Sequence, residues 1–268
     1  MAFDVVIPFH PKDGDLLPWC VQGVRRHLDA ARILGVTAAS ARPLVEAAGA
    51  TFVDEDSVVE GVTATSVKQK GWGWYFQQIL KFGMAAKVQT DYFACVDADT
   101  VFLNDVELID REGRPQYVTG TEYHRPYFDT FGEMMGFPAK REYSFIVHHM
   151  IFNRRVVEEL IGQMGPRSPW YENITALAGN PAPDGSTLRF SEYETYGHYL
   201  KAKRPEELNI RPLKWTNLAV APSERLLGRL GKRYDYCSFH AYARPTGAGP
   251  ARRLLGRARF ELKLLLGR

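Results

Sequence analysis

The pattern Asp-x-Asp, which can bind a divalent cation, occurs three times, as Asp13-Gly14-Asp15, Asp54-Glu55-Asp56 and Asp97-Ala98-Asp99. Only the third follows a long apolar run, DYFACV, which predicts a buried strand over residues 91–96. Ligands of open parallel sheets bind at the carboxyl ends of the strands. Two carboxylates there repel each other unless a cation lies between them, and Mg²⁺ or Mn²⁺ combines carboxylate with phosphate oxygens. Asp97 and Asp99 are therefore candidate metal ligands, and the alternative is a pair of solvated acids.

The elements that must position this motif alternate between apolar runs and amphipathic stretches. The runs predict strands at 3–9, 33–37, 51–53 and 91–96, and the stretches predict helices at 17–31, 41–48 and 75–87. In the second half we expect strands at 117–121, 145–152 and 235–242, an extended segment at 209–219, helices at 154–164 and 191–202, and loops at 123–140 and 180–187. This order predicts an α/β protein with a Rossmann-like, mainly parallel central sheet flanked by helices.

Composition narrows the class of protein further. The 268 residues carry a net charge of +3, which is too small to indicate nucleic-acid binding, and they suffice for one large domain. The three cysteines, Cys20, Cys95 and Cys237, match no zinc or disulfide spacing and indicate a reducing compartment. The N-terminus lacks the features of a signal peptide, and no apolar stretch approaches the ~20 residues of a membrane span. We expect a cytoplasmic protein.

Four segments carry a resemblance to a known class of enzyme: VVIPFHPKD, WYFQQILKF, VDADTVF and FSEYETYGHY. Together with the predicted order of strands and helices, they resemble GT-A glycosyltransferases. More narrowly, they resemble a bacterial family of glycosyltransferase-like proteins described mainly as a domain of unknown function. The resemblance extends from Asp4 to Tyr242. It implies a GT-A catalytic domain over 1–244, with a nucleotide-sugar-binding half (1–105) and an acceptor-binding half (106–244).

The resemblance also implies an activity and a metal site. The activity would be metal-dependent transfer of a sugar from a nucleotide-sugar donor to a glycan or lipid-linked acceptor in bacterial envelope glycoconjugate synthesis. Asp97 and mainly Asp99 would hold Mn²⁺ or Mg²⁺ against the donor diphosphate. His240, the only histidine after His198, would complete the metal site. The alternative is a structural role for this histidine.

Donor contacts are implied at the end of the first strand and on the helix before the metal motif. Their members are Pro8, His10, Lys12, Asp13, Gln77, Gln78, Lys81 and Asp97. Lys12 would meet a phosphate and Asp13 a ribose hydroxyl, unless both belong to an ordinary solvated turn. Lys81 is similar to a cation that contacts the donor in some GT-A families, and the alternative is a surface lysine. Trp72 and Trp74 either stack on base or sugar or belong to the core.

A cluster of acids at Ser191-Glu192-Tyr193-Glu194 supplies candidate catalytic residues. Ser191 and Glu194 have the spacing of a capping box, in which Glu194 serves the helix N-terminus. Glu192 is then free to deprotonate the attacking hydroxyl as general base. Similar acidic motifs do this in inverting GT-A enzymes, so we favour Glu192 over Glu194 and inversion slightly over retention. His148 and His149 are further candidates for acceptor contacts, with a structural role as the alternative.

The tail at 245–268 differs from the rest of the chain. Residues 251–268 contain six basic residues and one acid, and on a helical wheel one face carries Leu254, Leu255, Ala258, Leu262, Leu265 and Leu266. This pattern predicts a basic amphipathic helix that binds an anionic membrane surface, at the inner face of the cell membrane. A helix docked on the protein's own core and a dimer contact are the alternatives.

Three other classes of protein share parts of this pattern. Asp97-Ala98-Asp99-Thr100-Val101 also fits the motif of haloacid-dehalogenase-type phosphatases, but those carry it on the first strand and need a later acidic pair. Sugar-nucleotide pyrophosphorylases need a Gly-rich basic loop after the first strand, which is absent. A non-catalytic carbohydrate-binding protein is the remaining alternative, and hydrolysis of a nucleotide sugar would exclude it.

Overall fold

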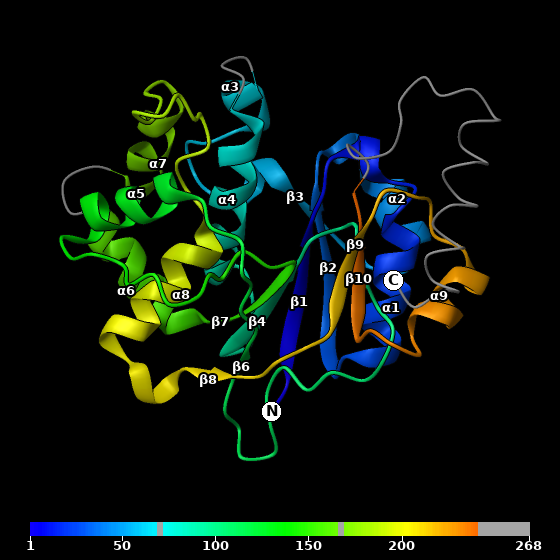
Figure 1. Cartoon of the computed structure of the whole chain (residues 1–268). Coiled ribbons are helices and arrows are strands. Elements are labelled where there is room, and N and C mark those ends of the chain that lie inside the picture. Colours follow the sequence, from blue (N-terminus) through cyan, green and yellow to red (C-terminus); the bar gives the residue numbers. More distant parts are fainter. Residues whose placement is uncertain (69–71, 166–168, 241–268) are drawn as a thin grey trace.

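A five-stranded sheet forms the centre of the molecule (Figure 1), in a computed structural model that describes residues 1–68, 72–165 and 169–240. Its strands are β1 Phe3–Pro8, β2 Ala30–Thr37, β3 Thr51–Asp54, β4 Tyr92–Val96 and β7 His149–Asn153, in the order β3-β2-β1-β4-β7. The first four pair in parallel and β7 is antiparallel to β4. The predicted α/β class with a mainly parallel sheet is confirmed. The order 3-2-1-4 reverses between β1 and β4, where sheets of this type bind ligands.

Helices cover both faces of this sheet. They are α1 Leu17–His27, α2 Arg42–Ala47, α3 Ala64–Lys68, α4 Gly73–Gly83, α5 Arg125–Met135, α6 Arg154–Met164, α7 Trp170–Ala178, α8 Glu192–Lys203 and α9 Glu224–Leu230. Short 3₁₀ helices occur at Pro11–Asp13, Ala39–Ala41, Glu55–Ser57, Met84–Ala86 and Pro205–Glu207. In Figure 1, α4 to α8 are gathered on one side of the sheet, and α1, α2 and α9 lie on the other.

A second, three-stranded sheet begins directly after Asp97-Ala98-Asp99. It consists of β5 Thr100–Phe102, β10 Tyr236–Phe239 and β9 Trp215–Leu218, with β10 between the other two. Because β10 is antiparallel to β5, with Ser238 opposite Thr100, the start of β5 lies beside the end of β10. This pairing brings Asp99 and His240 together. A further short pair, β6 Gln116–Tyr117 and β8 Asn209–Ile210, lies apart from it.

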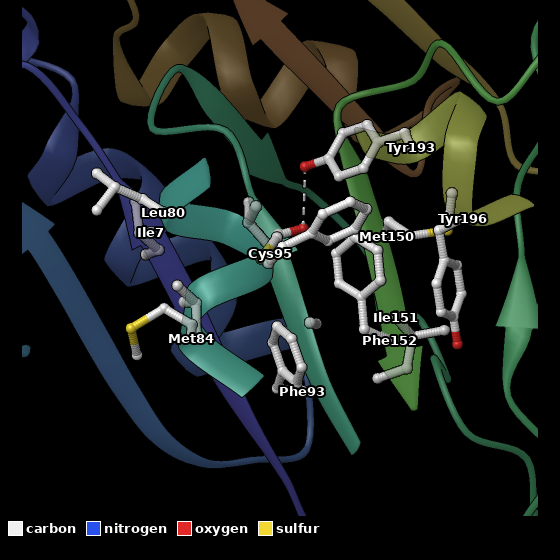
Figure 2. Packing of buried hydrophobic residues seen from close by; sticks show 14 of the residues in the cluster. Ile7, Leu80, Met84, Phe93, Cys95, Met150, Ile151, Phe152, Tyr193 and Tyr196 are labelled. Carbon is white, nitrogen blue, oxygen red and sulfur yellow. Dashed lines mark hydrogen bonds between the residues drawn. The ribbon is translucent and has the colours of Figure 1, made fainter. Parts of the chain in front are cut away.

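Aromatic side chains dock α8 on β4 and β7 (Figure 2). The ring of Phe152 packs 5.3 Å from that of Phe93 and 4.7 Å from that of Tyr196, between centroids. The Tyr193 hydroxyl donates to the carbonyl of Cys95 at 3.4 Å. Every residue of α8 from Glu192 to Leu200 is buried, so its polar side chains need partners inside the protein.

The structure corrects one predicted loop. Residues 123–140 were expected to lack regular structure because of their glycines and prolines, but α5 occupies 125–135. Pro126 stands in the first helical turn, where its missing N–H costs nothing. Gly136 follows the helix with φ of 75°, the left-handed conformation that ends many helices. The two residues that suggested a loop are the start and stop signals of a helix.

Other boundaries also differ from the predicted ones. The helix expected at 17–31 ends at His27, because β2 begins at Ala30. The strand expected at 117–121 is reduced to Gln116–Tyr117, and the one expected at 145–152 begins at His149. The sequence pattern did not predict β5, α3, α7 and α9. All four are short, from three to nine residues, and short elements carry little periodicity.

Candidate active site

The carboxyl end of β4 carries Asp97 and Asp99, next to the end of β1. The chain turns here from the central sheet into β5. The third Asp-x-Asp thus lies at the predicted edge, where the order of strands reverses. Asp13 belongs to the turn after β1, and the pKa of its carboxyl is raised by burial and by the charge of Asp99, against the effect of Lys12. The first and third acidic motifs therefore face one region.

Asp99 is contacted by two side chains and one backbone N–H, which come from β10 and from the residue after it. Ser238 Oγ donates to Asp99 Oδ1 at 2.7 Å, and His240 Nδ1 lies 3.0 Å from Asp99 Oδ2. The Phe239 N–H donates to the Asp99 carbonyl at 2.8 Å. The predicted neighbours Asp99 and His240 thus meet, while Ser238 was not anticipated. Its sequence position, two residues before a candidate ligand on a strand, could have indicated a side chain on the same face.

Asp97 points to different partners. Lys81 Nζ donates to its Oδ1 at 2.8 Å, and the Tyr193 hydroxyl lies 3.4 Å from the same atom. His148 Nδ1 lies 3.9 Å from Asp97 Oδ2. Burial opposes ionisation, but the Lys81 charge and the contact with His148 prevail and lower the pKa of Asp97 to about 2. Asp97 is therefore a carboxylate at neutral pH.

Lys81 is buried between two acids, so the alternative of a surface lysine is wrong. Its side chain is 3% exposed, and Nζ also donates to Glu192 Oε1 at 2.6 Å. The ammonium lies 4.1 Å from the centroid of the Tyr193 ring, within reach of a cation–π contact. Burial alone would lower the pKa of Lys81, but the charges of Asp97 and Glu192 hold it well above its usual value. The predicted donor contact is here the centre of an ion-pair triad.

Glu192 occupies the first position of α8. Its side chain is 2% exposed, and its N–H donates to Gln78 Oε1 at 3.3 Å. Burial raises the pKa of Glu192 above its usual value, although Lys81 acts in the opposite direction. A raised pKa brings a carboxylate nearer to the operating pH of a general base. Gln78, predicted to touch the donor, is buried, and its side chain accepts from the first N–H of α8.

Glu194 lies in a separate buried network, and only half of the predicted capping box forms. Ser191 Oγ accepts from the Glu194 N–H at 3.3 Å, as predicted. The Glu194 carboxylate instead accepts from Ser144 Oγ at 2.5 Å and from the Phe145 N–H at 3.1 Å, and it lies 2.9 Å from His198 Nε2. The carboxylate thereby anchors the segment that precedes β7. Phe145 in this segment belongs to no strand, so its N–H donates to Glu194 and not to a neighbouring strand. These contacts give Glu194 a structural role, and its alternative role as the catalytic base stays a prediction.

The other predicted donor residues lie around the end of β1. Gln77 Nε2 donates to the Pro8 carbonyl at 3.4 Å, which links α4 to this strand end. His10 Nδ1 accepts from the Lys12 N–H at 3.2 Å and so begins the 3₁₀ turn. His10 and Lys12 are exposed and Asp13 is half-buried. These side chains border the acidic motif from the β1 side.

His148, which precedes β7, and His149, its first residue, have different surroundings. His148 lies at the site, with its ring 5.3 Å from that of His240. His149 is buried between Phe102 and Tyr236, at 5.1 and 4.8 Å between ring centroids. Burial lowers the pKa of His149 to about 3, so it is neutral and structural. Because β7 is antiparallel to β4, its first residues lie beside the end of β4, where Asp97 and Asp99 follow.

Whether the residues fit a divalent cation depends on Asp99 and His240. Within the described ranges 1–68, 72–165 and 169–240, no three His, Cys, Asp or Glu side chains are grouped to hold a metal ion. Mn²⁺ and Mg²⁺ at nucleotide sites take one or two carboxylates and complete their shell with phosphate oxygens and water. Asp99 and His240 are 3.0 Å apart and partly exposed, at 23% and 14% of their side-chain surface. An oxygen and a nitrogen donor so placed fit that kind of site.

His240 is the last residue of the part that the structure describes. The predicted amphipathic helix at 245–268 and its membrane contact lie outside the described residues. Among the residues that were searched, no helix has the length and apolar character to cross a bilayer.

Fold and site together define an α/β protein with two aspartates, Asp97 and Asp99, at the carboxyl edge of its central sheet. Residues 38–222 match a family described as a family of unknown function (DUF6492), so the chain belongs to this family. The chain is also similar to the crystal structure of mouse xyloside xylosyltransferase 1 in its apo form, with a TM-score of 0.47 and 14% sequence identity. That similarity covers 91% of this chain and 99% of the other. No curated protein matches the sequence.

Proposed function

We propose that this protein is a metal-dependent glycosyltransferase of the GT-A type, which moves a sugar from a nucleotide-sugar donor to a glycan or lipid-linked acceptor. One observation carries the proposal. Asp97-Ala98-Asp99 ends β4 at the reversal of a 3-2-1-4 sheet, and Asp99 there meets His240 at 3.0 Å. The sequence resemblance of the segments around Pro8, Lys81, Asp97 and Glu192 to GT-A enzymes supports the same assignment.

The metal of this proposal is Mn²⁺ or Mg²⁺, held by Asp99 and His240. It would supply Lewis-acid stabilisation of the negative charge that develops on the leaving nucleoside diphosphate. Asp97 borders this site and holds the Lys81 ammonium, with 2.8 Å between Asp97 Oδ1 and Lys81 Nζ. Asp13, His10 and Lys12 form the β1 side of the donor site. Their proposed partners are the ribose and the phosphates.

Glu192 is the general base of the proposal. It would take the proton of the acceptor hydroxyl as that oxygen attacks the sugar carbon, which corresponds to an inverting reaction. Its burial and raised pKa suit the role, and Lys81, at 2.6 Å, fixes its carboxylate. Its first-turn position on α8 adds the favourable field of a helix N-terminus to the ionised form.

A binding and hydrolysis screen tests the proposal. Purified protein is titrated with UDP, GDP, CDP and dTDP, with and without Mn²⁺, and each corresponding nucleotide sugar is assayed for hydrolysis. We expect Mn²⁺-dependent binding of at least one diphosphate and slow hydrolysis of the matching donor. Binding of free sugars with no nucleotide binding would support a carbohydrate-binding protein instead.

The proposal includes a peripheral location at the cytoplasmic membrane, based on the basic, leucine-rich sequence after Pro250. Basic residues contribute about 1 kcal/mol each near an anionic surface. Full-length and 1–250 protein are compared by co-sedimentation with phosphatidylglycerol vesicles at low and high salt. We expect salt-sensitive binding of the full chain alone. Equal binding of both proteins would exclude the tail as the anchor.

A further inference from the structure

Three of the six large apolar side chains exposed in the described residues belong to one short segment, 186–190, or to the starts of the two helices that hydrogen-bond to it. Trp74, Tyr123 and Leu188 are exposed by 41%, 38% and 38%, and we call them the apolar rim. The others, Met1, Leu44 and Ile210, lie elsewhere along the chain. Exposed apolar side chains are ordinary when scattered, but a group of them marks a binding surface.

Hydrogen bonds tie the apolar rim to segment 186–190. On one side, Trp74 Nε1 donates to the Phe190 carbonyl at 3.2 Å, and the Tyr75 hydroxyl donates to the Thr187 carbonyl at 2.7 Å. On the other side, His124 Nε2 lies 2.7 Å from the Leu188 carbonyl. The starts of α4 and α5 are therefore both fixed to this segment.

The same segment leads directly into the candidate base. Phe190 and Ser191 precede Glu192, and both α4 and α5 pack against α8. Burial and then the charge of Glu192 raise the pKa of Tyr127, on the first turn of α5, which agrees with a short separation between the two side chains. The apolar rim thus lies at the segment that leads into the proposed reaction centre.

The chemistry of the rim favours a sugar ring. Tryptophan is highly buried on average, whereas the indole of Trp74 is oriented by its bond to Phe190 and leaves two fifths of its surface in solvent. Polar groups lie among the apolar ones: Arg141 stacks 3.4 Å from the centroid of the Tyr123 ring, and Ser186 Oγ lies 3.2 Å from His124 Nε2. A pyranose presents an apolar C–H face and a rim of hydroxyls, and flat aromatic surfaces with a few polar groups match it.

We infer that Trp74, Tyr123 and Leu188 form the acceptor subsite, and that the acceptor is a carbohydrate whose pyranose ring stacks on Trp74. The inference rests on the proposed function, because it places this ring next to Glu192. It selects a glycan acceptor over the acyl part of a lipid. It also explains why Trp74 is exposed at the start of an otherwise buried helix.

Saturation-transfer difference NMR on the full chain tests this inference. The probes are methyl pyranosides of glucose, galactose, mannose and N-acetylglucosamine, with UDP or GDP and Mn²⁺ present. We expect transfer to the C–H face of at least one pyranoside. Trp74→Ala should weaken binding at least tenfold, and Trp74→Phe should retain part of it. Trp19→Ala, which changes a tryptophan remote from the rim, is the matched control and should bind as the wild type does.

Leu188 allows a second comparison that does not alter a helix start. Leu188→Ala should weaken pyranoside binding about threefold, which corresponds to less than ~1 kcal/mol. Leu44→Ala and Ile210→Ala remove side chains of similar exposure and should have no effect. Thermal unfolding of every variant confirms that it is folded.

The outcomes separate the inference from the function on which it rests. Transfer to dodecylphosphocholine monomers but to no pyranoside would overturn the inference in favour of a lipid. Absence of transfer to any probe would overturn it as well. Pyranoside binding that depends on Trp74, in a wild-type protein that binds no nucleoside diphosphate and hydrolyses no donor, would uphold the carbohydrate subsite and reject the glycosyltransferase.

Discussion

Lys81 and Glu192, 111 residues apart in the sequence, form a buried ion pair with 2.6 Å between Nζ and Oε1. The same Nζ donates to Asp97 at 2.8 Å, so one cation from α4 joins the end of β4 to the start of α8. These two ends carry the proposed metal motif and the proposed base. The triad therefore fixes the position of the proposed metal motif relative to the proposed base.

Replacement of Lys81 should destabilise the fold strongly. Lys81→Met leaves the buried carboxylate of Glu192 and the partly exposed one of Asp97 without their cation, and removal of one partner of a buried pair costs about 3–5 kcal/mol. Adding Glu192→Gln should restore part of this loss, because one of the two charges disappears. Urea unfolding measures the free energy of unfolding for each variant.

Lys201→Met is the control for this experiment. Lys201 also donates to a carboxylate, Glu142, at 2.7 Å, but that carboxylate is 60% exposed. Exposed pairs contribute about 0–1 kcal/mol. A Lys81→Met variant no less stable than Lys201→Met would contradict the buried triad.

Asp99 should be essential for metal-dependent binding. Asp99→Ala removes the carboxylate that faces His240, so we expect loss of Mn²⁺-dependent binding of the nucleoside diphosphate while the protein stays folded. His240→Ala should weaken the same binding less, because one of two protein ligands remains. Isothermal titration with and without Mn²⁺ measures both.

A surface aspartate provides the comparison. Asp105 is 91% exposed and contacts His27, so Asp105→Ala should bind metal and nucleotide as the wild type does. If Asp99→Ala kept full Mn²⁺-dependent binding, the metal would have to bind elsewhere.

The sequence was informative about the strand ends and much less so about contacts across the fold. The meeting of Asp99 and His240 could be predicted because each stands near the end of an apolar run, and strand ends meet at one edge. The partners Lys81 and Glu192 could not, because neither periodicity nor spacing says which helix face meets which strand. The second half was harder to interpret because proline and glycine occur both in loops and at helix ends. Pro126 and Gly136 therefore fit a loop as well as the start and the end of a helix.

Glu192 and Glu194 should give different phenotypes. Glu192→Gln keeps a hydrogen-bond acceptor for Lys81 but removes the base, so turnover should fall roughly 10²-fold with donor affinity little changed. Glu194→Ala leaves Ser144 Oγ and the Phe145 N–H buried without their acceptor, at about 1–3 kcal/mol for each such group. Its main effect should therefore be on the free energy of unfolding. Steady-state kinetics and urea unfolding of both variants decide, and an exchange of the two phenotypes would make Glu194 the catalytic group.

His149 should make the stability of the protein depend on pH. Its pKa is about 3 in the folded protein, against an ordinary value of 6.5. Between these two values the unfolded chain binds a proton that the folded protein excludes, so stability is complete above pH 6.5 and is lost as the pH falls toward 3. Between the plateau above pH 6.5 and pH 5, this histidine alone should lower the free energy of unfolding by about 2 kcal/mol.

His149→Phe, which keeps a ring between Phe102 and Tyr236, should reduce this dependence on pH by that amount. Urea unfolding of wild type and His149→Phe at pH 5, 6 and 7.5 measures the slope, and equal slopes for the two proteins would show that acid destabilisation arises from other groups.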